Sequence, residues 1–278
     1  MKINFFVYLT IPIILIGQAE ERWDWVETIP KPWTLTKDEV SELLPEFRQR
    51  YPDFHDRLKA FALWRIGTPY EIFKLGEEID PDPDPIIRLD VSDCTAHILT
   101  CMAFVQSEDW DEAKEIMIDI HYKPDQKGEK RPTFQSRWHY TSHRISFHPS
   151  TIDITKDLTR RTDLEQVEIV LNEKSDGSEF LDLGWKQHMI MEFLPSENVT
   201  AAFLENLPEV CGVAFVKKSY FSQGIVIAHE GMIIDNTDIL HASQAKGTTL
   251  REDFMSYYFR EDGPIFDGMM VYRFEPLE

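Results

Sequence analysis

The apolar residues of this chain change their spacing beyond Leu204, from a helical period to short uninterrupted runs. Before that point, helical spacing predicts helices at about residues 36–47, 54–65, 93–106 and 110–120. After it, apolar runs broken by turn residues are typical of antiparallel strands, and they fall at residues 210–216, 224–228, 232–234 and 269–274. A helical first half followed by a stranded second half predicts an α+β fold.

Composition limits the partners that such a chain can have. The 278 residues are 42% hydrophobic, which is enough apolar material for a sizeable core. Asp and Glu number 49 against 29 Lys and Arg, giving a formal charge of -20 at pH 7. This charge repels phosphate backbones and anionic lipid heads at long range, so nucleic acid is not an expected partner.

The N-terminus has the pattern of a signal peptide. Lys2 precedes an apolar run at residues 3–16, and the small-residue segment Gly17-Gln18-Ala19 follows it. The run is shorter than the roughly 20 residues that a membrane-spanning helix needs, and Pro12 would interrupt one. We expect residues 1–19 to be removed and residues 20–278 to form a single domain, exported to the periplasm or the extracellular space without stable membrane insertion.

The three cysteines are an odd count, which does not provide a disulfide framework. Cys94 is predicted to lie in the first turn of a helix, where the positive end of the helix dipole favours the thiolate that attacks an amide. Cys101 and Cys211 lie within apolar runs and are predicted to be core residues. Cys94 is therefore the candidate nucleophile, and its alternative interpretation is a small buried hydrophobe.

A thiol nucleophile needs a base, and the chain has nine histidines. His241, at the end of a predicted strand, is the first candidate. His229 closes another predicted strand, His97 lies one helical turn after Cys94, and His139 lies between two aromatic residues. Each of these histidines could instead be a surface residue or a satisfied core residue.

No metal site or other cofactor is expected from the sequence. The alternating Asp and Pro residues at 80–84 lack the Gly turn and the terminal Glu of a calcium loop. His139 and His143 have the interval of a helical metal site. They fall in a stretch predicted to be loop or strand, where this interval does not place both side chains on one face.

Short motifs follow one another along most of the chain, from about residue 61 to residue 274. They are Gly67-Thr68-Pro69-Tyr70, Leu89-Asp90, Asp93-Cys94-Thr95, Ser136-Arg137-Trp138-His139-Tyr140, Asp153-Ile154-Thr155, Gly224-Ile225, His241-Ala242-Ser243 and Gly268-Met269-Met270-Val271-Tyr272-Arg273. In this order they resemble the N-acetylmuramoyl-L-alanine amidase-like branch of the NlpC-type papain-like cysteine hydrolases, bacterial enzymes that cut the peptide stems of peptidoglycan.

The resemblance implies a papain-like (NlpC-type) fold, with N-terminal helices packed on a C-terminal antiparallel sheet and the Cys on a helix N-terminus. It implies that Cys94 is the nucleophile and that His241 is the polar residue that orients the catalytic imidazole. The ligand would be a peptidoglycan fragment or muropeptide, and the reaction would be acyl transfer to sulfur followed by hydrolysis. The residues that would line the substrate cleft are Tyr70, Asp93, Arg137 and His139.

Three positions depart from the family pattern. Two are minor: Ala96-His97 follows Cys94-Thr95 where Thr-Phe is usual, and Gly212-Val213 stands where Gly-Asp is usual. The third is serious. The family places its catalytic His in a Ser-His-Val-Gly-Ile strand start, and the matching stretch here is residues 221–225, so Ser222 occupies the position of the base and would face Cys94. A Ser cannot act as the general base near neutral pH. Two hypotheses follow. One is an active amidase in which His241, or as second choice His229, acts as the base; the other is a degenerate member that binds cell-wall peptide without cutting it.

Overall fold

The computed structural model describes residues 22–277. The predicted signal peptide lies outside these residues, and the start of the predicted domain at residue 20 does too, so both stay predictions. The chain divides into two compact units, Met1–Pro30 and Lys31–Glu278. In the first unit, residues 22–28 are helical. No helix among the described residues is long and apolar enough to cross a membrane.

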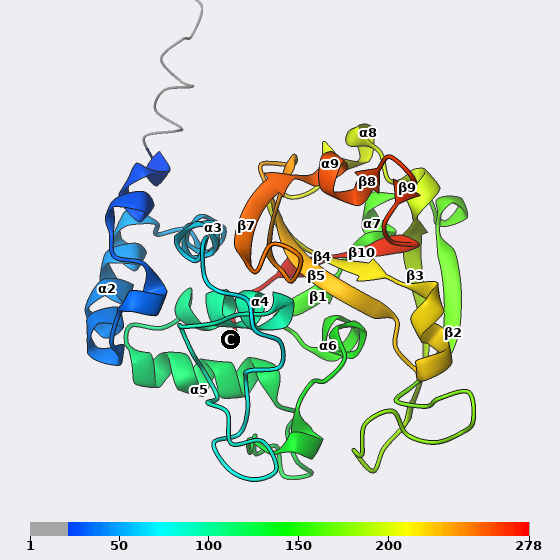
Figure 1. Cartoon of the computed structure of the whole chain (residues 1–278), viewed down its shortest axis with the longest axis horizontal. Coiled ribbons are helices and arrows are strands. Elements are labelled where there is room, and N and C mark those ends of the chain that lie inside the picture. Colours follow the sequence, from blue (N-terminus) through cyan, green and yellow to red (C-terminus); the bar gives the residue numbers. More distant parts are fainter. Residues whose placement is uncertain (1–21, 278) are drawn as a thin grey trace, which may run out of the picture. The chain divides into compact units, whose positions relative to one another are not determined.

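Helices fill the first part of the second unit, as the apolar spacing predicted (Figure 1). They are η1 (Pro32–Thr34), α2 (Lys37–Arg50), α3 (Phe54–Trp64), α4 (Cys94–Phe104), α5 (Trp110–His121), η2 (Phe134–Ser136) and α6 (Thr141–Phe147).

Side-chain caps fix where the four longer helices begin. Thr36 and Glu39 form a capping box at the start of α2. Asp53, Asp93 and Asp109 each accept a backbone N–H at the start of α3, α4 and α5. The boundary that matters most for function is the one at Asp93, because it makes Cys94 the first residue of α4.

The rest of the unit is built around an antiparallel sheet with the strand order β2-β3-β10-β4-β5-β6-β7, and β1 pairs with β10 (Figure 1). The α+β prediction, with N-terminal helices packed on a C-terminal antiparallel sheet, is confirmed, and α4 packs on β5 and β6. The elements are β1 (Thr151–Asp153), α7 (Thr155–Leu158), η3 (Arg161–Asp163), β2 (Glu165–Leu171), β3 (Gln187–Pro195), η4 (Ser196–Asn198), α8 (Ala201–Leu204), β4 (Val210–Val216), η5 (Lys218–Gln223), β5 (Ile227–Ile234), β6 (Asp238–Ser243), β7 (Thr248–Asp253), α9 (Phe254–Tyr258), β8 (Phe259–Arg260), β9 (Gly263–Pro264) and β10 (Gly268–Phe274).

The predicted strand at residues 224–228 is wrong in its first half. Gly224 does not start a strand: it ends η5 in the left-handed conformation, with φ of 71° and its N–H bonded to the carbonyls of Tyr220 and Phe221. The strand begins at Ile227 and runs without a break through the predicted segment 232–234. The predicted strand at 210–216 coincides with β4. The predicted strand at 269–274 matches β10, which begins one residue earlier.

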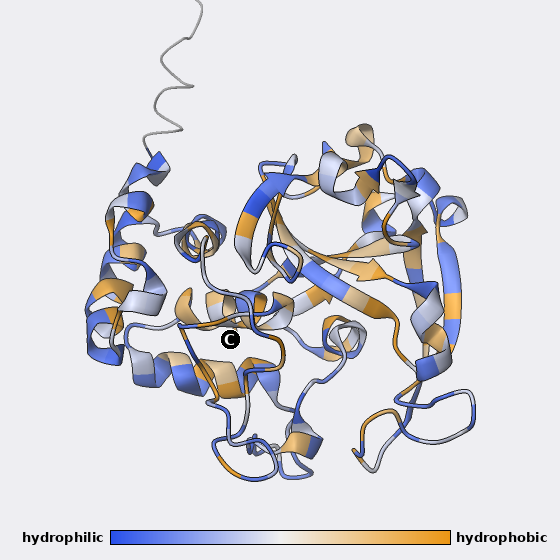
Figure 2. Cartoon of the chain, in the orientation of Figure 1, coloured by the Kyte–Doolittle hydropathy of each residue, from blue (hydrophilic) through white to orange (hydrophobic). Residues whose placement is uncertain are grey.

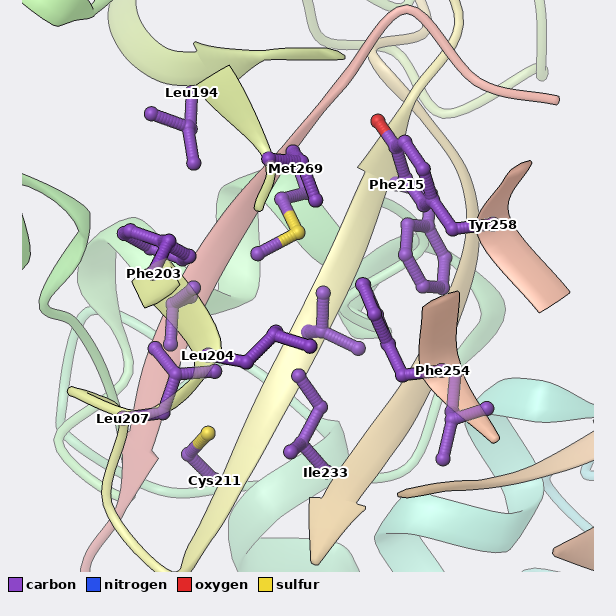
Figure 3. Packing of buried hydrophobic residues seen from close by; sticks show 14 of the residues in the cluster. Leu194, Phe203, Leu204, Leu207, Cys211, Phe215, Ile233, Phe254, Tyr258 and Met269 are labelled. Carbon is purple, nitrogen blue, oxygen red and sulfur yellow. The ribbon is translucent and has the colours of Figure 1, made fainter. Parts of the chain in front are cut away.

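One face of the sheet carries an apolar cluster under α8 and α9 (Figure 3). Phe203 and Leu204 of α8 and Phe254 of α9 pack there against Phe215 and Cys211 of β4. Every residue of β4 is buried, and Figure 2 shows β4 as predominantly apolar, whereas β2 alternates between exposed and buried positions. The central strands are therefore a buried support on which α4 can be placed rigidly.

Candidate active site

The first turn of α4 is held by the carboxylate of Asp93. One oxygen, Oδ1, accepts the N–H of Ala96 at 2.8 Å, and the other, Oδ2, accepts the N–H of Phe73 at 2.8 Å. Burial raises the pKa of this carboxyl group. Cys94 follows as the first helical residue and is partly exposed, whereas Cys101 and Cys211 are buried, and all three thiols are free.

The sulfur of Cys94 lies against β5, where that strand separates from β6. The two strands pair only between Met232–Ile234 and Asp238–Leu240. Beyond that stretch, the backbone N–H of Glu230 is a hydrogen-bond partner of the Cys94 thiol. The nucleophile candidate is thus placed beside the peptide unit that joins His229 to Glu230.

Cys94 is held in its protonated form. Burial, followed by the charges of Asp93 and Glu230, raises the pKa of its thiol to about 12, against the opposite effect of hydrogen bonds from Glu230 and Thr95. The lowered pKa expected from the helix N-terminus alone is therefore wrong, because burial of the sulfur, and then the charges of two nearby carboxylates, outweigh the effect of the helix end. A base has to remove the proton during attack.

A hydrogen-bonded chain of side chains starts at the residue preceding Glu230. Nε2 of His229 lies 2.8 Å from Nδ1 of His241, and Nε2 of His241 lies 2.9 Å from Oε1 of Glu252. A carboxylate only accepts hydrogen bonds, so Nε2 of His241 carries the proton and its Nδ1 accepts from His229. This leaves the lone pair of neutral His229 on Nδ1, the atom that can take a proton.

Both imidazoles are kept neutral by their surroundings. Burial, and then the charge of His241, lowers the pKa of His229 to about 3. Burial also lowers the pKa of His241, while the hydrogen bond to Glu252 raises it. The ring of Tyr257 packs on His241, with 4.5 Å between the ring centroids, and covers this pair.

Two local features of β5 make the approach of the histidines possible. The register between β4 and β5 shifts so that Phe215 pairs with His229 and Val216 with Ile227, which leaves Ala228 as a β-bulge immediately before His229. Two residues later stands Gly231. A Cβ there would lie 2.8 Å from Cδ1 of Ile239 and 3.2 Å from Cβ of His241, so the glycine leaves room for β6.

Glu230 points to a buried polar cluster instead of solvent, with 0% of its surface exposed. Oε1 accepts hydrogen bonds from Thr95 at 2.8 Å and Thr141 at 3.1 Å. Oε2 accepts from Arg144 at 2.6 Å and from the hydroxyl of Tyr272 at 2.7 Å. This carboxylate therefore links α4, α6 and β10 to the strand that carries His229.

The structure brings together some of the predicted site residues. Cys94 and Asp93 start α4, and His241 is joined to His229. Burial, and then the charges of Cys94 and Asp93, raises the pKa of the Tyr70 hydroxyl to about 12, so Tyr70 belongs to the same neighbourhood.

Ser222 lies elsewhere, which corrects the position expected for it. It is exposed in η5, and its carbonyl accepts from the N–H of Ser175 at 2.8 Å and from the hydroxyl of Ser175 at 3.1 Å. Among residues 22–277, no hydrogen bond joins Ser222 to Cys94, His229 or His241. Ala228-His229-Glu230-Gly231-Met232 has the His and Gly of the family strand start in register, a signal that the match to Gly224-Ile225 concealed.

Arg137 and His139 were expected to line the substrate cleft, and the structure gives their polar atoms internal partners. Arg137 is 8% exposed and pairs with Glu77 and, at 2.9 Å, with Asp82. Nε2 of His139 donates to the carbonyl of Phe134 at 2.5 Å. The acidic loop around Asp82 thus binds a guanidinium. The described residues contain no group of three or more His, Cys, Asp or Glu side chains that could hold a metal ion.

Comparison with known proteins gives the family and the fold. A family model described as AmiA-like, N-acetylmuramoyl-L-alanine amidase-like, matches residues 61–263. The fold is similar to that of protein LPG0564 from Legionella pneumophila, assigned to the DUF1460 family, with a TM-score of 0.70 and 16% identity over 86% of this chain and 94% of that one. It is also similar to an N-acetylmuramoyl-L-alanine amidase from Bacteroides uniformis, with a TM-score of 0.60 and 16% identity over 78% of this chain and 98% of that one.

At these identities the structural matches show a shared fold. The comparison with curated proteins gives no significant match. The family model matches well over half of the chain. The matched residues include the start of α4 and the strands β5 and β6, which carry His229 and His241. The chain belongs to the N-acetylmuramoyl-L-alanine amidase-like family.

Proposed function

We propose that this protein is a papain-like cysteine hydrolase that cleaves an amide bond in peptidoglycan or muropeptide, with Cys94 as nucleophile and His229 as general base. The supporting observation is that the chain His229–His241–Glu252 begins at the residue next to the N–H that bonds to the Cys94 thiol. His241 keeps the orienting role that the family resemblance implies. The predicted export of the chain agrees with a substrate outside the cytoplasmic membrane and stays a prediction.

In this mechanism the proton leaves the thiol as the bond to carbon forms. Nδ1 of His229 takes the proton while Sγ of Cys94 attacks the amide carbon, and backbone N–H groups in the first turn of α4 stabilise the oxyanion. Glu252, acting through His241, stabilises the imidazolium. Cleavage of the C–N bond returns the proton to the leaving amine and leaves a thioester, which a water activated by His229 then hydrolyses to the acid.

The alternative is a binding protein that holds cell-wall peptide without cutting it. It is favoured by one observation: the pKa of the Cys94 thiol is raised to about 12 and that of His229 is lowered to about 3, so both groups resist the charged pair. A fast enzyme has to stabilise the thiolate and the imidazolium in the transition state against these pKa shifts. A protein that only binds does not.

Mass analysis of muropeptides incubated with the mature chain separates the two functions. We expect the parent to form product and Cys94→Ala and His229→Ala each to lower the rate by at least about a hundredfold, the range for loss of acid–base catalysis. Ser222→His should change it less than about threefold, because Ser222 is exposed in η5. His188→Ala, at an exposed histidine of β3 paired with Glu168, is the matched control.

Two results would contradict the assignment. Full activity in His229→Ala would exclude His229 as the base, and a gain in activity in Ser222→His would restore Ser222 to the catalytic position. If no variant forms product but the parent binds muropeptide, the binding protein is the correct function.

A further inference from the structure

A surface groove of about 440 Å³ lies between the segment that follows α5 and the residue that leads into β3. Its walls include Lys123, Pro124 and Gln135 on one side and Trp185 on the other. Neither the nucleophile nor the histidine chain is part of its lining.

Lys123 occupies an unusual position for a cation in this groove. Its Nζ lies 3.8 Å from the ring centroid of Trp185 and 5.3 Å from that of Trp138, so the ammonium is held between two indole rings. Burial lowers its pKa to about 8. Within residues 22–277, no carboxylate lies at ion-pair distance from Lys123, which is notable in a chain with a net charge of -20.

The other polar groups around the groove have hydrogen-bond or ion-pair partners, or are neutral. Arg131 pairs with Glu129, and the carboxylate of Asp125 accepts the backbone N–H groups of Lys127 and Glu129. Two histidines face Lys123, and burial lowers the pKa of each to about 4, with the charge of Lys123 as a further cause, so both are neutral at pH 7: His139 and His143. Among the described residues, Lys123 is therefore the cation of the lining that no carboxylate neutralises, while Asp125 keeps a negative charge that backbone N–H groups satisfy.

We propose that this groove is a binding subsite for a peptide carboxylate, in which Lys123 pairs with the carboxylate and the part of Trp185 that lines the groove contacts the adjoining apolar part of the peptide. A half-buried ammonium without a counter-ion is stabilised most by an anion that forms an ion pair with it. A planar carboxylate could reach Lys123 from the solvent side of the groove. That the anion belongs to a peptide rests on the proposed function; the pairing with Lys123 does not.

The test measures binding in the Cys94→Ala background, where cleavage cannot interfere. The probes are N-acetyl-D-alanyl-D-alanine and its C-terminal amide, followed through the indole N–H signals of the protein, with Trp185→Phe identifying the Trp185 signal. We expect the acid to bind at least tenfold more tightly than the amide and to shift the Trp185 signal. Lys123→Met should lower the affinity for the acid to that for the amide and leave the amide unchanged.

Lys123→Arg keeps the charge and should keep the selectivity, and Lys127→Met, at an exposed lysine of the same segment, controls for a general loss of positive charge. Affinity for the acid should fall as the pH rises through about 8, because Lys123 loses its proton there, and the Lys123→Met profile should be flat. Equal binding of acid and amide, or unchanged selectivity in folded Lys123→Met, would overturn the proposal. Muropeptide cleavage is measured separately, so failure of either proposal leaves the other standing.

Discussion

At the scale of single residues, Cys94 has neighbours with opposite effects on its charge. The helix N-terminus and the N–H of Glu230 favour the thiolate, while burial and the carboxylates of Asp93 and Glu230 favour the thiol. Burial, with the two carboxylates as the next cause, prevails, since the pKa of the thiol is raised to about 12. In the resting site Cys94 is therefore a neutral thiol, the form that is oxidised less easily than a thiolate.

Replacing Glu230 by Gln should increase the reactivity of Cys94. The substitution removes a negative charge that raises the thiol pKa, so we expect alkylation of Cys94 by iodoacetamide at pH 7.5 to become at least about threefold faster. Mass mapping after brief treatment gives the rate at each cysteine. Tyr272→Phe removes one hydrogen bond to Glu230 but keeps the charge, and should give no increase.

The Gln variant also leaves Arg144 without its counter-ion, which costs about 3–5 kcal/mol for a buried pair. Alkylation is therefore compared only where circular dichroism shows a folded protein. An unchanged or slower rate in folded Glu230→Gln would show that the charge of Glu230 does not control the thiol.

Sequence reasoning named the nucleophile candidate and gave His229, the base proposed above, only as its second choice. Cys94 is predictable because an Asp cap followed by an apolar helical pattern marks a helix start. The pairing of His229 with His241 depends on a bulge at Ala228 and on the register of β5 with β6, and no local pattern encodes either. The family motif was also matched to Gly224, which in the structure is the left-handed C-cap of η5 and does not begin a strand.

At the scale of elements, Gly231 is the position on β5 that allows β6 to bring His241 close. We predict that Gly231→Ala destabilises the protein by about 1–3 kcal/mol, the usual cost of overpacking, and lowers the proposed amidase activity more than tenfold by moving His241. Urea unfolding and product formation provide the two measurements.

A second substitution tests the cause. The closest atom to the added Cβ would be Cδ1 of Ile239, at 2.8 Å, and Ile239→Val removes that atom. Adding it to Gly231→Ala should recover part of the stability, whereas Ile239→Val alone should cost about 0.5–1.5 kcal/mol. Additive losses in the double variant would mean that the clash is not the reason for the glycine.

The helices were predicted more completely than the strands for a physical reason. Each long helix has its own cap and its own apolar stripe, so neighbouring residues in the sequence determine where it begins and ends. The apolar runs do not reveal β2, because it alternates buried Val167 and Ile169 with exposed Gln166 and Glu168 and is completed only by pairing with β3.

At the scale of the whole molecule, buried neutral histidines make stability dependent on pH. Burial lowers the pKa of His148 to about 4, and burial with the charge of Lys123 lowers that of His143 to about 4, against about 6.5 in an unfolded chain. Between these values the unfolded state binds more protons, so stability is lost as pH falls from about 6.5 toward 4, by up to about 1.4 kcal/mol per pH unit for each group.

We therefore expect the melting temperature to fall steadily from pH 7 to pH 4.5. Burial raises the pKa of Glu77 above its ordinary value of 4.5 and that of Asp153 above 3.8, which acts in the opposite direction over part of the same range and makes the fall shallower. His148→Gln should reduce the slope, because one proton-binding difference is removed. A melting temperature that stays constant between pH 7 and pH 5 would contradict this account.

The cluster around Glu230 also affects how mutations in this protein will be interpreted. Thr141 and Arg144 come from α6 and bond to Glu230, not to the sulfur or the imidazole, yet Glu230 is the neighbour of His229 and the partner of Thr95 beside Cys94. A random screen for lost activity should therefore return α6 variants together with those at Cys94 and His229. Such a screen identifies the residues that keep Cys94 and His229 in position as well as those two residues themselves. Measuring the reactivity of the Cys94 thiol in each variant would distinguish the two kinds of residue.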